Sequence, residues 1–137
     1  HVFSMILCVC SAPLWCMCGK RAVCHVIFYM SLIICQAGMD RLRAKSLLLT
    51  GYLEYLLREE LSSEAKIFTP SDPAQRGCQL SLSFNIDLDT ALKLLGENGV
   101  MCDIRRPSCM RVAPTPLYNT FSDVYHFVRV LKSILVK

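Results

Sequence analysis

The feature that most constrains the fold is a strict alternation of apolar and polar residues between positions 78 and 84. Such alternation is typical of a β-strand that turns one face to the core and the other to solvent. The apolar positions are Cys78, Leu80, Leu82 and Phe84. A strand of this pattern belongs to a sheet with one buried face, so other elements of the chain must cover that face.

Helical periodicity supplies two of the covering elements. Between about Met39 and Glu60, leucines fall on one helical face, with charged residues between them. A second helix is predicted to start after Asp87, whose side chain caps it, and to end at Gly99. The apolar face of the first helix consists of Leu42, Leu49, Leu53 and Leu56. That of the second consists of Leu88, Ala91, Leu92 and Leu95.

The last predicted helix runs from about Phe121 to Leu135. Thr120 followed by Asp123 is typical of a helix start, because a hydroxyl and a carboxylate satisfy backbone amides that the helix leaves unpaired. The residues expected to face inward are Val124, Phe127, Val128, Leu131 and Leu135. This helix would complete one apolar layer over the sheet.

Further short strands complete the predicted sheet. Residues 100–104 alternate, and a short turn leads the chain back into Met110–Ala113, so these segments should pair as an antiparallel hairpin. We also expect a loop at Ser62–Lys66 and a short strand at Ile67–Thr69, which is followed by turn residues. The sequence therefore predicts an α+β fold with a small antiparallel sheet packed with helices.

Arg111 lies near the end of the hairpin's second strand, shortly before Pro114 and Pro116. Proline removes a backbone donor and fixes φ, so the two prolines end the ladder and make a rigid turn. An arginine beside a rigid turn suits the two-point binding of a carboxylate. On residue type and position alone, a surface arginine or a structural ion pair is the commoner alternative.

The first 36 residues differ in composition from the rest. They contain six of the nine cysteines and no acidic residue, whereas 13 of the 15 basic residues follow them. The near balance of charge after residue 36 gives no indication of nucleic-acid binding. We therefore divide the chain into a cysteine-rich apolar head at 1–35, expected to be irregular and either non-native or disordered, and a domain at 36–137.

Three interpretations of the head remain open. Cysteine pairs at 8/10 and 16/18 suggest a metal site, but zinc modules mostly space paired cysteines two to four residues apart in polar sequence. A membrane or signal segment agrees better with the apolar residues than a metal site does, although neither apolar run reaches the roughly 20 residues of a spanning helix. We favour translated non-coding sequence, because the head lacks periodicity, caps and acidic residues. We expect no metal and no membrane partner.

A series of stretches in residues 36–137 carries a family resemblance. These stretches are Leu42–Ser46, Leu49–Leu56, Ile67–Ser71, Arg76–Leu80, Gly99–Asp103 with Arg105, and Arg111–Phe121 with Asp123–Tyr125. They resemble the C-terminal small domain of kynureninase, a pyridoxal-phosphate enzyme of fold type I in the aspartate aminotransferase superfamily. The matches occur in the family's order over about a hundred residues, so they are specific to the family.

The resemblance implies a cytoplasmic homodimer of tryptophan catabolism and NAD biosynthesis. Its reaction would be the hydrolysis of L-kynurenine to anthranilate and L-alanine, or of 3-hydroxykynurenine to 3-hydroxyanthranilate and L-alanine. Arg111 lies in the matching Arg-Val-Ala-Pro motif, which implies that it holds the α-carboxylate of the substrate. Arg76, Tyr118 and Asn119 are expected to be structural, holding turns and domain contacts.

The same resemblance implies that the catalytic and cofactor-binding residues are not in this sequence. In the family, the lysine that holds pyridoxal 5'-phosphate lies in a large-domain segment with Trp-Cys and Tyr-Lys-Tyr around it, and this sequence has no such segment. We therefore expect this chain alone to bind no cofactor and to be inactive. The alternative is a short non-catalytic product that acts as an interaction module at the enzyme's dimer or domain interface, with apolar surface exposed on its first helix.

Overall fold

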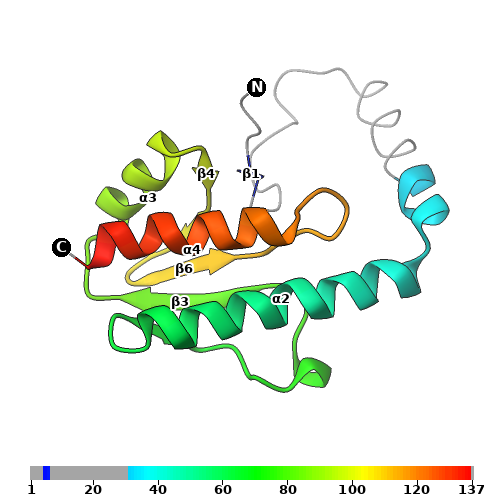
Figure 1. The fold of residues 1–137 in the computed structure, drawn as a ribbon, viewed down its shortest axis with the longest axis horizontal. Coiled ribbons are helices and arrows are strands. Elements are labelled where there is room, and N and C mark those ends of the chain that lie inside the picture. The colour runs from blue at the N-terminus through cyan, green and yellow to red at the C-terminus, as the bar shows by residue number, and fades with distance from the viewer. Residues whose placement is uncertain (1–4, 7–30, 137) are drawn as a thin grey trace.

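The computed structural model describes residues 5–6 and 31–136, in which helices pack on a small sheet (Figure 1). The sheet has four strands in the order β2-β3-β6-β5, and each neighbouring pair is antiparallel. The strands are β2 (Ala65–Ile67), β3 (Leu80–Phe84), β5 (Asp103–Arg105) and β6 (Cys109–Val112). The predicted α+β class is confirmed.

Three helices form the layer over the apolar face of the sheet. They are α2 (Met39–Leu61), α3 (Leu88–Glu97) and α4 (Phe121–Leu135), and α2 and α4 lie side by side (Figure 1). Each fully buried side chain of leucine or phenylalanine size stabilises the fold by about 1.5–3 kcal/mol. The core between the layers includes Leu49, Leu53, Leu57, Leu80, Leu82, Met110, Phe127 and Leu131.

The helix ends follow the expected capping chemistry. Thr120 accepts a hydrogen bond from the Asp123 amide while Asp123 accepts one from the Thr120 amide, which is a complete capping box. The Asp87 side chain accepts from the Thr90 amide at the start of α3, and Gly99 has a φ of 74° beyond its end. The predicted bounds of α4 are therefore confirmed, and those of α3 agree closely.

Three strand predictions differ from the structure. The edge strand β2 begins at Ala65 rather than Ile67, because residues 65–67 pair with β3, whereas the Thr69 hydroxyl accepts from the Ser81 amide in place of a ladder bond. Strand β3 begins at Leu80 rather than Cys78, since the Cys78 carbonyl accepts a hydrogen bond from the Thr50 hydroxyl.

The predicted strand at 100–104 is divided in two. Its first part, β4 (Val100–Met101), pairs in parallel with β1 (Met5–Ile6), and its second part is β5. The hairpin of β5 and β6 is antiparallel, as predicted. The division occurs because the two parts pair with different strands, which the alternation of side chains alone does not reveal.

Of the predicted head, the structure describes residues 5–6 and 31–35. Besides β1, residues 31–37 are helical, and Gly38, with a φ of 78°, separates them from α2. The metal interpretation concerns the cysteines at 8–24 and His25, which lie outside the described residues. The apolar runs of the membrane interpretation, 2–18 and 23–35, lie mostly outside them. The boundary near Gln36 falls within the helical residues 31–37 and stays a prediction.

Within residues 5–6 and 31–136, no helix combines the length and apolar character that crossing a bilayer requires. The same described part of the chain has no group of three or more histidine, cysteine or acidic side chains placed to hold a metal ion.

Candidate functional site

The sheet has a polar face on the side opposite its apolar face. Directly opposite residues on neighbouring antiparallel strands share a face, so the register places Lys66 beside Ser83, and Ser81 and Asp103 on either side of Arg111. Arg111 is therefore the cation at the centre of this polar face, between β3 and β5.

Arg111 belongs to a cluster of charges on the β5–β6 hairpin, which we call the hairpin cluster: Arg105, Asp103 and Arg111. Asp103 Oδ2 pairs with Arg111 Nη2 and, at 3.2 Å, with Arg105 Nη2. The Arg111 side chain is 26% exposed, and its Nε is buried without a hydrogen-bond partner. The cluster thus presents a partly exposed guanidinium that is held on one side by Asp103.

The turn after β6 explains why Arg111 is held in place. Strand β6 ends at Val112, before the two prolines, and the buried Asn119 accepts a hydrogen bond of 2.7 Å from the Thr115 amide. The Asn119 amide in turn donates to the Thr115 carbonyl at 2.9 Å. These contacts support the structural role expected of Asn119, whereas the side chain of Tyr118 is half-exposed.

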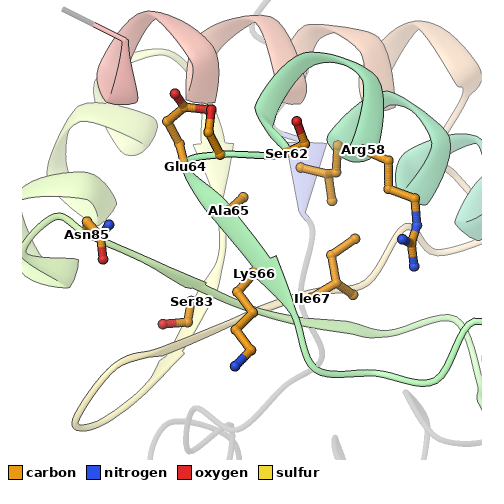
Figure 2. Close-up of a pocket in the computed structure, with 10 residues that line it drawn as sticks. Arg58, Ser62, Glu64, Ala65, Lys66, Ile67, Ser83 and Asn85 are labelled. Atoms are coloured by element: carbon orange, nitrogen blue, oxygen red, sulfur yellow. The ribbon is translucent and has the colours of Figure 1, made fainter.

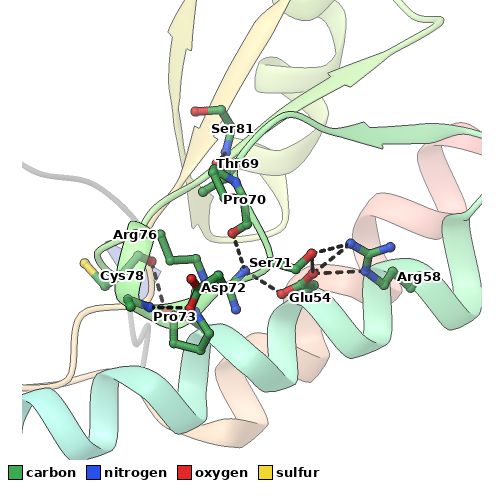
Figure 3. Close-up of polar contacts among 12 residues, drawn as sticks. Glu54, Arg58, Thr69, Pro70, Ser71, Asp72, Pro73, Arg76, Cys78 and Ser81 are labelled. Atoms are coloured by element: carbon green, nitrogen blue, oxygen red, sulfur yellow. Dashed lines mark hydrogen bonds and ion pairs between the residues drawn. The ribbon is translucent and has the colours of Figure 1, made fainter.

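A second cluster of charges lies between α2 and the segment 69–77 (Figure 3). We call it the loop cluster: Glu54, Arg58, Ser71 and Arg76. Glu54 accepts hydrogen bonds from Arg58, Ser71 and Arg76, and Arg76 also donates to the Pro70 carbonyl at 3.1 Å. The Arg76 side chain is only 5% exposed, so this cluster fixes the segment on α2.

The pKa of Glu54 reflects two opposing causes. Burial raises the pKa, but hydrogen bonds from Ser71, Arg76 and Arg58 and the charge of Arg76 outweigh burial, so the pKa lies below its ordinary value. Glu54 is therefore an ionised structural carboxylate. This geometry supports the structural role expected of Arg76.

The segment 69–77 has further anchors. It contains the short 3-10 helix η1 (Pro73–Gln75), which the Asp72 side chain caps by accepting from the Ala74 amide. Arg43 of α2 donates to the carbonyls of Pro73 and Arg76 at 2.7 and 3.2 Å. The segment is thus attached to α2 along its length, and these bonds do not involve the polar face around Arg111.

A pocket of about 550 Å³ opens beside the edge strand β2 (Figure 2). Residues from the end of α2, the following loop, β2 and β3 line it, including Arg58, Glu64, Lys66 and Asn85. Arg111 is not among its lining residues. The pocket mixes charges of both signs at a sheet edge, so we do not assign the candidate site to it.

Sequence reasoning identified Arg111 but not its partner Asp103. The Asp-Ile-Arg sequence at 103–105 carries a signal, because charged residues two apart on a strand share one face. That they meet Arg111 depends on the hairpin register, which sequence alternation alone does not fix.

Comparison with solved structures defines the class of fold. The chain is similar to a C-DES mutant with glycine covalently linked to its PLP cofactor, with a TM-score of 0.58 and 15% identity over 71% of this chain and 25% of that one. It is also similar to the glycine decarboxylase P-protein of the glycine cleavage system, with a TM-score of 0.60 and 21% identity over 79% and 24% of the two chains. The fold is that of the small domain of PLP-dependent enzymes.

The sequence comparisons define the family. Residues 42–131 match the model of the kynureninase C-terminal domain, and the chain belongs to this family. It is 52% identical over 105 residues to a kynureninase of Monosiga brevicollis, and 51% identical over 108 residues to that of Mus musculus. In both matches the alignment covers 73% of this chain and 23% of the relative, so the chain spans about a quarter of the length of its curated relatives.

The described residues do not fit the cofactor of the fold class. Lys132 is paired with Glu60 at 3.1 Å, and Lys66 lies over the Phe68 ring at 5.4 Å from its centroid. Lys93 is exposed on α3, and Lys45 lies on α2. Lys66 lines the pocket beside β2, but Glu64 lines the same pocket and would repel a phosphate, and the other three amines do not line it. We therefore derive no chemical step through pyridoxal phosphate on this chain.

Proposed function

We propose that this chain is the C-terminal small domain of a kynureninase that hydrolyses L-kynurenine, and 3-hydroxykynurenine, to anthranilate or 3-hydroxyanthranilate and L-alanine. Family membership supports the reaction, and the observation that carries the proposal for this chain is the position of Arg111. Pyridoxal phosphate would be held by the large domain of the complete enzyme, which would be a cytoplasmic homodimer. The chain alone would bind no cofactor and would be inactive.

Arg111 would bind the α-carboxylate of the amino-acid substrate. Its guanidinium is partly exposed at the centre of the polar face, on a strand whose end is fixed by the turn after Val112. A planar guanidinium can donate two parallel hydrogen bonds to a carboxylate, and a fixed one orients the rest of the substrate over the reacting centre. The chain would therefore contribute substrate positioning, and the large domain the chemistry.

The test uses mouse kynureninase with its matching C-terminal region replaced by residues 36–137 of this chain, which we call the exchange enzyme. We expect it to hydrolyse L-kynurenine. Arg111→Lys should raise KM by about tenfold or more, because lysine keeps the charge but loses the two-point donor geometry. The matched control is Arg129→Lys, an exposed arginine 3.7 Å from Glu60, which should leave KM unchanged. An unchanged KM in Arg111→Lys would remove the carboxylate role.

The absence of cofactor binding to the chain alone is tested directly. Purified chain is mixed with pyridoxal phosphate and reduced with borohydride, and the labelled lysines are identified by mass spectrometry. We expect slow labelling spread over several lysines. Saturable labelling of one lysine would contradict the proposal that the cofactor site is on the large domain.

The alternative is a short non-catalytic product that binds at the enzyme's dimer or domain interface. Exposed apolar side chains on α2, namely Leu47, Leu48 and Tyr55, favour it. Tryptic peptides distinguish the two candidates, since the peptide from Ala22 to Arg41 crosses the boundary at Gln36. Detection of this peptide in tissue, together with loss of kynureninase activity when excess chain is added, would support the alternative.

A further inference from the structure

The hairpin cluster distributes one negative charge between two positive ones. Asp103 Oδ2 accepts from Arg111 and lies 3.2 Å from Arg105 Nη2, so the three side chains carry a net charge of +1. We propose that Asp103 is a positioning residue that fixes the Arg111 guanidinium for a carboxylate ligand, and that Arg105 offsets the charge of Asp103. This inference rests on the proposed function of Arg111 and extends it to two residues.

Asp103 restricts the side chain of Arg111. The hydrogen bond described for its guanidinium is the one to Asp103, and its Nε lies buried without an acceptor. A free arginine side chain loses rotamer entropy when it binds a ligand, and this cost is smaller when the protein has already fixed the side chain. Asp103 stands directly opposite Arg111 in the ladder, so the backbone of both strands holds the two partners in register. Asp103 thus fixes the orientation of the guanidinium before a ligand binds.

The charge of Asp103 also affects an anionic ligand at Arg111. A carboxylate beside Arg111 repels an incoming carboxylate, and this repulsion would weaken the binding that the orientation improves. Arg105 occupies the same face two residues from Asp103, and its side chain is 52% exposed at the edge of the sheet. Its charge offsets that of Asp103, so Arg111 keeps its full attraction for an anion. Arg105 therefore acts without touching the ligand.

Steady-state kinetics of the exchange enzyme test whether Asp103 contributes to substrate binding. Asp103→Asn should raise KM for L-kynurenine by about tenfold to a hundredfold, with a smaller change in kcat, because the guanidinium loses its fixed orientation. The matched control is Asp89→Asn, which removes another carboxylate that pairs with an exposed arginine, Arg106, at 3.0 Å. This control should leave KM unchanged. An unchanged or lower KM in Asp103→Asn would overturn the inference, the lower value by showing that Asp103 competes with the substrate.

The salt dependence of KM in a second variant, Arg105→Gln, distinguishes an effect of charge from an effect on structure. The substitution should raise KM by roughly threefold to tenfold at low salt, and the increase should shrink at high ionic strength, because the interaction of an exposed charge is screened. A KM increase that does not depend on salt would contradict the charge-offset role. Thermal unfolding midpoints of all variants check that each protein is folded.

A measurement on the 137-residue chain separates this inference from the proposed function. Side-chain nitrogen NMR should resolve distinct Nη signals for Arg111 in the parent chain, since a fixed guanidinium rotates slowly about its Nε–Cζ bond. Asp103→Asn should merge these signals, and Asp89→Asn should not. If the signals respond to Asp103 but the unmutated exchange enzyme does not hydrolyse kynurenine, the positioning stands and the proposed function fails. Signals unaffected by Asp103→Asn would overturn the positioning whatever the activity.

Discussion

Two clusters in this molecule share one composition, a carboxylate between two arginines, but differ in how completely their donors are used. In the loop cluster, Glu54 accepts from Arg58, Ser71 and Arg76, and Arg76 also donates to a backbone carbonyl. In the hairpin cluster, Arg111 pairs with Asp103 while its Nε has no acceptor. The hydrogen-bonding groups of the loop cluster are used within the fold, whereas the hairpin cluster keeps a partly exposed guanidinium.

Burial follows the same division. Arg76 is 5% exposed and Glu54 10%, whereas Arg111 is 26% exposed. Removing one partner of a buried pair destabilises the fold because it leaves an uncompensated buried charge. A partly exposed pair contributes much less to stability and can exchange partners. The number of hydrogen bonds made within the fold and the degree of burial, rather than residue type, distinguish a structural arginine from one available to a ligand.

The largest expected effect is on the loop cluster. Glu54→Gln should lower the free energy of unfolding of the 137-residue chain by about 3–5 kcal/mol, because the buried Arg76 loses its counter-ion. Urea unfolding at neutral pH measures it. The control is Asp89→Asn, an exposed pair that should change stability by about 1 kcal/mol or less. If both variants lose the same amount, the distinction between the two clusters fails.

Acid should remove the contribution of Glu54 in a predictable direction. Its pKa in the folded chain lies below the ordinary value of 4.5, so its stabilisation is fully present above about pH 4.5 and is lost as the pH falls through the folded pKa. The stability difference between the parent chain and Glu54→Gln should therefore shrink in acid. Urea unfolding of both proteins at about pH 3 and pH 7 tests it. A constant difference would show that Glu54 does not act through its charge.

The hairpin cluster should tolerate loss of its arginine. Arg111→Gln should change the free energy of unfolding by about 1 kcal/mol or less, since the pair is partly exposed and Asp103 keeps Arg105. The same substitution in the exchange enzyme should nevertheless impair kynurenine hydrolysis severely. Urea unfolding and steady-state kinetics on one variant thus measure both properties. A destabilisation comparable to that of Glu54→Gln would place Arg111 with the structural arginines.

The smallest effect is expected at Arg58. Its side chain is exposed and pairs with Glu54 one helical turn away, an arrangement worth about 0.3–0.5 kcal/mol. Arg58→Gln should therefore shift the unfolding midpoint only slightly. A loss of several kcal/mol in the free energy of unfolding would show that the exposed Arg58 stabilises the fold as much as the buried Arg76 does. Burial would then not distinguish the two arginines.

Local patterns predicted the parts of the fold that local chemistry decides. The capping box at Thr120 marked the start of α4, and the alternation at 80–84 marked β3 with its buried face. Pairing with other segments decided the rest. Cys78 lies outside β3 because its carbonyl accepts a hydrogen bond from Thr50. Residues 100–104 are divided because residues 100–101 pair with β1 and residues 103–105 pair with β6.

The candidate site was predictable to a similar degree. The family motif identified Arg111, but its contact with Asp103 required the register of the hairpin. The loop cluster joins residues 17 and 22 positions apart, through a segment whose conformation the sequence pattern left open. Such contacts arise from tertiary structure, and no short sequence motif predicts them.

The short strand β5 also has a consequence for how this molecule behaves toward copies of itself. It is an outer strand of the sheet, only three residues long, and two of the three carry charge. Unpaired backbone groups on an outer strand invite pairing with another chain, and charged side chains oppose it. Asp103 and Arg105 therefore also protect this margin of the sheet against edge-to-edge aggregation, so neutralising both would be expected to lower the solubility of the chain.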